Sequence, residues 1–249
     1  MKIQHTFIYF TSLILVLLFS SSLQAQNDSI VNDSIRYTQK YGLRLGGDLS
    51  KLARTIIDDD YSGFEINGDY RLSKNLYIAG ELGTEDKTTD SEYLNSTAKG
   101  SYFKAGVDYN LYQNWFGMEN MIYSGFRVGV GSFSQTINSY SIYDPYGQPW
   151  LSGNEPITKT DGTKYSGLTA TWGELIIGLK AETLNNLYIG LNVQLKGRIT
   201  EKEPDGFENL YIPGFGRTYD SGRFGIGFGY NISYLIPIFK KGKNTLQKD

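Results

Sequence analysis

Charged side chains of both signs recur at alternate positions along this chain, and they are the first candidates for chemistry. The acidic ones are Asp48, Glu65, Asp69, Glu81, Asp108 and Glu174, and the basic ones are Arg44, Arg71, Lys104, Arg127, Lys196 and Arg198. Two carboxylates at a suitable separation can act as general acid and base. Carboxylates that face arginine and lysine instead form ion pairs, so the role of this set depends on where the backbone places it.

Chemistry based on histidine or cysteine is excluded for most of the chain. The sequence contains no cysteine, and its one histidine, His5, lies close to the N-terminus. A serine activated by histidine therefore cannot form in a mature chain that has lost this segment. The consecutive carboxylates Asp58, Asp59 and Asp60 could offer oxygen ligands to Ca²⁺, but no glycine-bearing ligand loop follows them. We expect no enzymatic activity, no metal and no cofactor.

The N-terminus has the pattern of a secretory signal peptide. Lys2 and His5 precede an apolar run over 7–19, and a small residue, Ala25, follows shortly after it. The run is too short to cross a bilayer as a helix. We predict a signal peptide over 1–25 that is cleaved after Ala25, and a polar periplasmic linker over 26–40. An uncleaved anchor is the alternative.

From Tyr41 to Phe239 the dominant pattern has a period of two. In the stretch RFGIGFGYNISYLIPIF, for example, Phe224, Ile226 and Phe228 alternate with glycines. This alternation recurs about eight times and predicts β-strands with two unlike faces. We expect strands near residues 41–49, 64–72, 76–83, 102–111, 122–131, 174–181, 187–198 and 223–239, with an irregular start to the sixth. Long connections, roughly 50–62, 84–100, 134–165 and 200–222, alternate with short turns.

Two architectures fit these strands. A soluble ligand-binding barrel turns its apolar face inward, whereas an outer-membrane barrel turns it toward lipid. Strands of about ten residues and alternating long and short connections favour the membrane barrel. Alternate glycines favour it too, because they leave room in a narrow lumen for charged side chains. The predicted fold is all-β, an eight-stranded antiparallel transmembrane β-barrel of the outer-membrane type over 41–239, followed by a polar C-terminal tail over 240–249.

In this arrangement the twelve charged residues named above form an ion network in the lumen, and outer-membrane lipid surrounds the barrel. The net charge of −2 gives no electrostatic reason to expect a nucleic-acid partner.

Three stretches carry a resemblance to a known family: SGFEINGDYRLSKNLYIAGELG, KGSYFKAGVDYNLYQNWFGMENMIY and ENLYIPGFGRTYD. They resemble an uncharacterised family of small outer-membrane barrels of Gram-negative bacteria, known as a domain of unknown function. The resemblance implies a fold and a location, the cell outer membrane, but no activity. The end of the last strand, with Gly229, Ile232, Tyr234 and Phe239, is similar to the signal that the barrel-assembly machinery recognises. That machinery is therefore an expected partner.

Three functions remain open at this point. The first is a non-enzymatic barrel whose external loops bind a partner or brace the envelope; the partner itself is unknown. The second is a small solute pore, and the third is a soluble periplasmic ligand-binding barrel. Aromatic residues in the last two long connections suit recognition, but they equally suit loops that fold over the barrel mouth, and the latter is favoured. They are Tyr140, Tyr143, Tyr146, Trp150, Phe207, Tyr211, Phe215 and Tyr219.

Overall fold

A computed structural model of the chain describes residues 38–91, 94–112, 119–142, 157–204, 208–219 and 222–242. The predicted signal peptide lies outside these residues, as do most of the linker and of the C-terminal tail. Four of the loop aromatics, Tyr143, Tyr146, Trp150 and Phe207, also fall outside them. None of the helices in the described ranges is long and apolar enough to cross a membrane.

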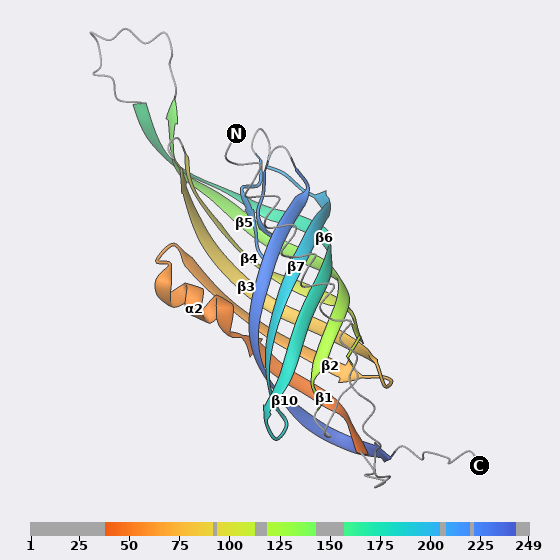
Figure 1. Ribbon diagram of the computed structural model, residues 1–249. Helices are drawn as coiled ribbons and strands as arrows, with labels where there is room; N and C mark the ends of the chain where they lie inside the picture. Colours follow the sequence, from red (N-terminus) through yellow and green to blue (C-terminus); the bar gives the residue numbers. More distant parts are fainter. Residues whose placement is uncertain are drawn as a thin grey trace, which may run out of the picture. The chain divides into compact units, whose positions relative to one another are not determined.

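Eight antiparallel strands close into one barrel in the order β1-β10-β7-β6-β5-β4-β3-β2 (Figure 1). They are β1 (Thr38–Asp48), β2 (Tyr61–Arg71), β3 (Leu76–Ser91), β4 (Leu94–Asn110), β5 (Met121–Ile142), β6 (Ile157–Leu184), β7 (Leu187–Glu201) and β10 (Phe224–Gly242). Each strand pairs with the next long strand in the sequence, and β1 pairs with β10 to close the ring. The predicted eight-stranded barrel is confirmed. Its first and last strands extend beyond the predicted limits of 41 and 239.

The two faces of the barrel wall differ in the sense expected for a membrane protein. Large apolar side chains point outward; Leu191, for example, is 49% exposed. Charged side chains point inward and are buried, and Glu174 is 0% exposed. A soluble barrel would bury its apolar face and leave its charges in water. The arrangement is that of a transmembrane barrel, in which the lipid-facing side is apolar and the interior polar.

The predicted long connection over 84–100 is wrong, because most of it is strand. β3 and β4 remain paired as far as Ser91 opposite Leu94. β5 and β6 likewise remain paired as far as Ile142 opposite Ile157, so 134–142 and 157–165 are strand where a loop was expected. Figure 1 shows β5 and β6 running on together beyond the other strands. Outside the lipid neither strand face needs apolar residues, so the alternation stops although the pairing continues. We call residues 84–91, 94–101, 132–142 and 157–169 the outer sheet.

The connection between β1 and β2 contains a helix, α2 (Leu49–Ile57), where the sequence analysis expected a loop. The Asp48 carboxylate caps it by accepting a hydrogen bond from the Ser50 amide at 2.8 Å. Its apolar residues fall at helical spacing on one face: Leu49, Leu52, Ala53, Ile56 and Ile57. The helix ends at Asp58, whose amide donates to the Arg54 carbonyl at 2.8 Å.

The β7–β10 connection also contains two short strands, β8 (Tyr211–Ile212) and β9 (Gly216–Arg217), which pair with each other. A register shift between Thr171 and Trp172 confirms the irregularity expected at the start of the sixth long strand.

Candidate functional site

The inward charged side chains of the barrel form one connected set, here called the lumen ion network. Its members are Arg44, Glu65, Asp69, Glu81, Lys104, Asp108, Arg127, Glu174, Lys180 and Lys196. They come from seven of the eight barrel strands, β1 to β7. Because side chains alternate between the two faces of a strand, inward positions on neighbouring strands meet across the ladder.

At the end of the barrel where the short turns lie, the Arg44 guanidinium contacts the Asp69 carboxylate at 2.8 Å and packs over the Tyr188 ring at 4.7 Å. Lys180 joins this pair to the next, because its Nζ lies 2.6 Å from Asp69 and 3.8 Å from Asp108. Asp108 in turn pairs with Arg127 at 2.8 Å. Positive and negative groups therefore alternate along the lumen.

The centre of the network is Lys104, which is 1% exposed. Its ammonium pairs with Glu81 and lies 3.4 Å from Glu65 and 3.7 Å from Glu174. Each of these carboxylates has a further partner. Arg127 lies 3.4 Å from Glu81, the Tyr102 hydroxyl donates to Glu65 at 2.5 Å, and the Trp172 indole donates to Glu174 at 2.7 Å.

Three residues predicted for the network lie elsewhere. Asp48 caps α2 and also accepts from the Tyr230 amide at 3.3 Å. Arg71 pairs with Glu119 at 3.0 Å, close to the short turns. Arg198 pairs with Glu201 on its own strand at 2.8 Å. The alternation in the sequence assigned these three positions to the inward face of the strands. It did not predict at which end of the lumen each residue lies.

Three charged residues in or beside the network were not predicted from the sequence: Lys180, Lys51 and Glu85. Lys180 lies on the same inward-facing set of alternate β6 positions as Glu174, so the sequence pattern could have placed it in the network. Glu85 lies in the part of β3 that was expected to be a loop, and Lys51 lies on the unexpected helix. Lys51 pairs with Glu85 and lies 3.9 Å from Glu65, so it ties α2 to the network.

One end of the lumen is covered by residues 209–217, here called the lumen cap. Ile212 and Phe215 are buried against Tyr102, Phe133 and Trp172. Glu85 accepts hydrogen bonds from the Tyr211 hydroxyl at 2.8 Å and from the Gly214 amide at 2.9 Å. Of the aromatic residues predicted either to bind or to fold over the mouth, Tyr211 and Phe215 fold inward.

A glycine is required at position 214 of the cap. Its backbone has φ +84°, and a Cβ there would lie 2.5 Å from the Tyr102 ring. Its carbonyl accepts a hydrogen bond from the Lys196 ammonium at 2.7 Å. The cap is thus fixed to β3 and β7 by polar contacts and to the wall aromatics by packing.

The barrel wall is incomplete beside the cap. β1 ends at Asp48, opposite Asn231, whereas β10 begins at Phe224. Among the described strands, residues 224–230 of β10 pair with β7 alone, and residues 61–65 of β2 pair with β3 alone. We call the space between these two segments the wall gap.

Helix α2 lies along the wall gap and satisfies part of its exposed backbone. The Thr55 hydroxyl accepts a hydrogen bond from the Gly63 amide of β2 at 2.9 Å. On the other side of the gap, the Asp48 carboxylate receives the Tyr230 amide of β10. Side chains of the helix and its cap thus replace, at a few positions, the neighbouring strand that β1 does not provide.

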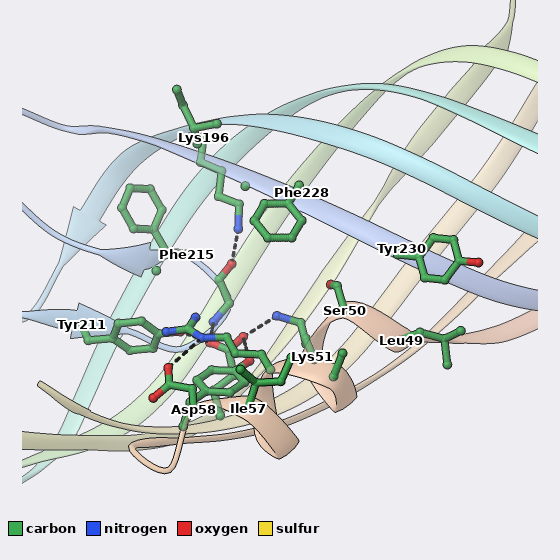
Figure 2. A pocket seen from close by; sticks show the side chains of 18 residues that line it. Leu49, Ser50, Lys51, Ile57, Asp58, Lys196, Tyr211, Phe215, Phe228 and Tyr230 are labelled. Atoms are coloured by element: carbon green, nitrogen blue, oxygen red, sulfur yellow. Dashed lines mark hydrogen bonds and ion pairs between the residues drawn. The ribbon is translucent and has the colours of Figure 1, made fainter.

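Between α2, the lumen cap and β10 lies a cavity of about 550 Å³, here called the α2 groove. Its apolar lining comes from all three elements and comprises Leu49, Ala53, Ile57, Phe215, Ile226, Phe228 and Tyr230. Figure 2 shows Phe228 and Tyr230 on β10, with Leu49, Lys51 and Ile57 on the helix below them. Three polar lining residues are already paired: Lys51 with Glu85, Lys196 with the Gly214 carbonyl, and Asp58 with Lys87.

Three titratable groups around the groove are each held in one protonation state by their neighbours. Burial opposes the charge on Lys51, but Glu85 and Glu65 together raise the pKa of its ammonium above the ordinary value. Hydrogen bonds from Lys87 and Arg54 lower the pKa of the Asp58 carboxyl. Burial and the Glu85 carboxylate hold the pKa of the Tyr211 hydroxyl well above its ordinary value, so it remains a donor. Within the described ranges, no group of three or more metal-ligating side chains is placed to hold an ion.

The residues similar to an assembly signal lie on β10. Gly229 faces inward, where a Cβ would lie 2.8 Å from the Asn192 side chain. Tyr234 is outward and exposed. Phe239 stacks on Tyr41 with ring centroids 5.1 Å apart. A register shift beside Tyr41 brings it opposite Phe239.

Comparison with known proteins gives a family and a set of loosely similar folds. The solved structures that resemble the chain include Ail, the attachment invasion locus protein of Yersinia pestis, at 9% identity and a TM-score of 0.36, with 79% of this chain and 97% of that chain covered. Acinetobacter baumannii CarO2 is similar at 8% identity and a TM-score of 0.34, with 80% of this chain and 99% of that chain covered. Because these TM-scores are low, the fold assignment is based on the strand pairing and on the polarity of the two faces of the barrel wall. A search of curated proteins gave no match.

The family model for a domain of unknown function, DUF6048, matches residues 6–241, which is nearly the whole chain. The chain therefore belongs to the DUF6048 family.

Proposed function

We propose that this protein is a non-conducting, non-enzymatic barrel of the outer membrane that acts through the structure it presents beyond the lipid. The observation that carries the proposal is the filled lumen. The ion network occupies its length and the cap covers one end. A cavity in the middle of the lumen has a volume of only about 20 Å³, room for about one water molecule.

The same contacts argue against a catalytic use of the carboxylates. Glu81, Asp108 and Asp69 each contact a lysine or arginine, and they lie in the covered lumen. A general acid or base must lie within hydrogen-bond reach of its substrate, but the described cavity that Asp69 and Glu81 line has a volume of only about 20 Å³. The proposal therefore assigns them a structural role.

The outer sheet is the part of the molecule best suited to contacts outside the membrane. It projects polar side chains that are tied to one another across its strands. The Thr88 and Thr97 hydroxyls lie 2.9 Å apart, and the Asn138 amide donates to Asn95 at 2.6 Å and to Thr97 at 2.9 Å. Such a sheet offers hydrogen-bonding groups in fixed positions, which suits binding to a partner or bracing against another envelope component.

The free edge of the outer sheet is shaped against strand addition. β6 pairs with β7 only from Ala170 onward, so on that side its outer part has no partner strand among the described residues. Gly162 and Gly167 both have φ +72°, and register shifts interrupt the β5–β6 pairing near them. Bulges of this kind make an edge a poor template for another strand. We therefore assign contacts to the side chains of the sheet rather than to its edge.

The experiment that tests this role is deletion of residues 136–162. Gln135 and Tyr165 are register partners, so the deletion leaves Thr163 and Lys164 as a two-residue hairpin turn. The shortened barrel should still fold and migrate faster when unboiled than when boiled on a denaturing gel. Proteins crosslinked to the wild type in whole cells should be lost from the deletion variant.

A matched variant replaces only residues 143–156 with a Gly-Ser linker and leaves both strands of the outer sheet intact. Retention of the crosslinked partners in this variant would assign the contact to the sheet. An identical partner set in wild type and in the 136–162 deletion would contradict the proposed role.

A further inference from the structure

Helix α2 carries an apolar face that no described part of the chain covers. Leu52, Ile56 and Ile57 are 39%, 82% and 83% exposed. The opposite face is the polar one, and it turns Lys51 and Thr55 toward the barrel. A helix on the surface of a water-soluble domain has the reverse orientation, with its apolar stripe inward.

The apolar face of α2 lies beside the lipid-facing surface of the barrel. Along β10 the outward residues Phe224, Ile226 and Phe228 are 72%, 81% and 77% exposed. Ile226 and Phe228 also line the α2 groove, together with Ile57 of the helix. The groove is thus continuous with the apolar surface that a transmembrane barrel turns toward hydrocarbon.

The chemistry of the groove points to an apolar occupant. Its ammonium groups are already engaged: Lys51 by Glu85, and Lys196 by the Gly214 carbonyl. Arg54 pairs with Asp58 at 3.2 Å and packs over the Tyr61 ring at 4.0 Å. No unpaired cation among the described lining residues is therefore available to recognise a phosphate or carboxylate. The volume of about 550 Å³ lies within the range of about 300–1,000 Å³ that is usual for small-molecule sites.

We propose that the α2 groove binds one acyl chain of a lipid from the surrounding membrane, which enters sideways through the wall gap. The chain lies between Ala53 and Ile57 of the helix and Ile226 and Phe228 of β10, and its tip approaches Phe215 of the lumen cap. This inference goes beyond the proposed function, because it concerns the wall gap and not the outer sheet.

The test is native mass spectrometry of the full mature barrel, refolded in detergent and titrated with dioleoyl phosphatidylcholine or dioleoyl phosphatidylglycerol. The wild-type barrel should retain one lipid molecule more tightly than all other bound lipids. Its affinity for this molecule should be the same for the two lipids, which differ only in their headgroups. Ala53→Trp should weaken this lipid at least about tenfold, because an indole in the groove displaces several methylene groups. Leu191→Trp, on the lipid-facing surface of β7, is the matched control and should bind as wild type does.

Each variant is first checked for a heat-modifiable barrel, and Ile57→Trp replaces Ala53→Trp if that variant does not fold. Equal retention in wild type and the groove variant would overturn the proposal. So would retention that requires the anionic headgroup, since it would assign recognition to charge. The 136–162 deletion leaves the groove intact, so the lipid result and the partner result can fail independently.

Discussion

Substitution of Lys104 by methionine tests the role of the lumen ion network most sharply. Methionine keeps most of the side-chain volume and removes the charge that Glu65, Glu81 and Glu174 share. Removing one partner of a buried ion pair costs about 3–5 kcal/mol, because the remaining charge is left without compensation. Here each carboxylate keeps another cation: Glu81 keeps Arg127, and the other two keep Lys51 and Lys196. We therefore expect a loss of about 3 kcal/mol, at the lower end of that range.

The assay is equilibrium unfolding in urea of the barrel refolded into lipid vesicles, followed by gel migration without boiling. The control is Lys99→Met, which makes the same chemical change on the same strand. Lys99 pairs with Asp86 at 3.2 Å, but its side chain is 71% exposed. Exposed pairs contribute about 0–1 kcal/mol, so this variant should unfold close to wild type.

A second comparison separates the charge from its geometry. Lys104→Met combined with Glu81→Gln removes one cation and one anion, and it should recover part of the loss, since coupled neighbours are not additive. Equal stability of Lys104→Met and Lys99→Met would refute the reasoning that the network is buried and coupled.

The remaining predictions concern the wall and the helix. Gly106→Ala should lower the free energy of unfolding by about 1–3 kcal/mol, because its Cβ would lie 1.8 Å from a backbone oxygen of β5. Gly227→Ala should lower it much less, because its Cβ meets only the movable ends of side chains. The urea unfolding midpoints of the two variants test this difference. Val107→Arg should destabilise the barrel by about 2–4 kcal/mol near the lipid midplane and Thr84→Arg by about 0–1 kcal/mol beyond it, and equal costs in vesicle unfolding would mean that the lipid-facing surface is misplaced. The lowered pKa of Asp58 means that its stabilising contribution is present at neutral pH and lost as the pH falls through that lowered value. Hydrogen exchange in α2, corrected for its intrinsic pH dependence, should therefore accelerate in acid and be accelerated at neutral pH by Asp58→Asn; protection independent of pH would contradict this.

The wall of the barrel was predictable because its two faces meet different surroundings. Val107 and Lys104 belong to one strand, yet one faces lipid and the other a narrow lumen, so the sequence must alternate. This alternation predicted directly that Glu81, Arg127 and Asp108 face inward. Which face lies outside was argued from strand length, the alternation of long and short connections, and glycine, and the burial of the charged side chains decided it.

The outer sheet was missed because its strands have no lipid on either face. Thr88, Asn95 and Thr97 pair as regularly as the residues inside the membrane, but their side chains are polar on both sides. Period-two reasoning detects a difference between faces and not the pairing itself. A strand that leaves the membrane therefore reads as a loop.

Helix α2 was not predicted, whereas the lumen cap was anticipated only as aromatic residues that fold over the barrel mouth. The sequence does contain a pattern that predicts the helix, because apolar residues follow Asp48 at helical spacing. The apolar face points away from the barrel, however, and is not part of a protein core. The cap aromatics Tyr211 and Phe215 were expected in the long connection over 200–222. Which of the loop aromatics turn into the lumen depends on contacts with Tyr102, Trp172 and Glu85, which lie far away in the sequence.

The central claim is that the lumen is closed, and single-channel recording of the full mature barrel in a planar bilayer tests it most directly. With the ion network and the cap in place, we predict no stable conductance at neutral pH and moderate voltage. Steady channels of uniform size would contradict the claim, and a change in their ion selectivity on Arg127→Gln would place the current in the lumen itself.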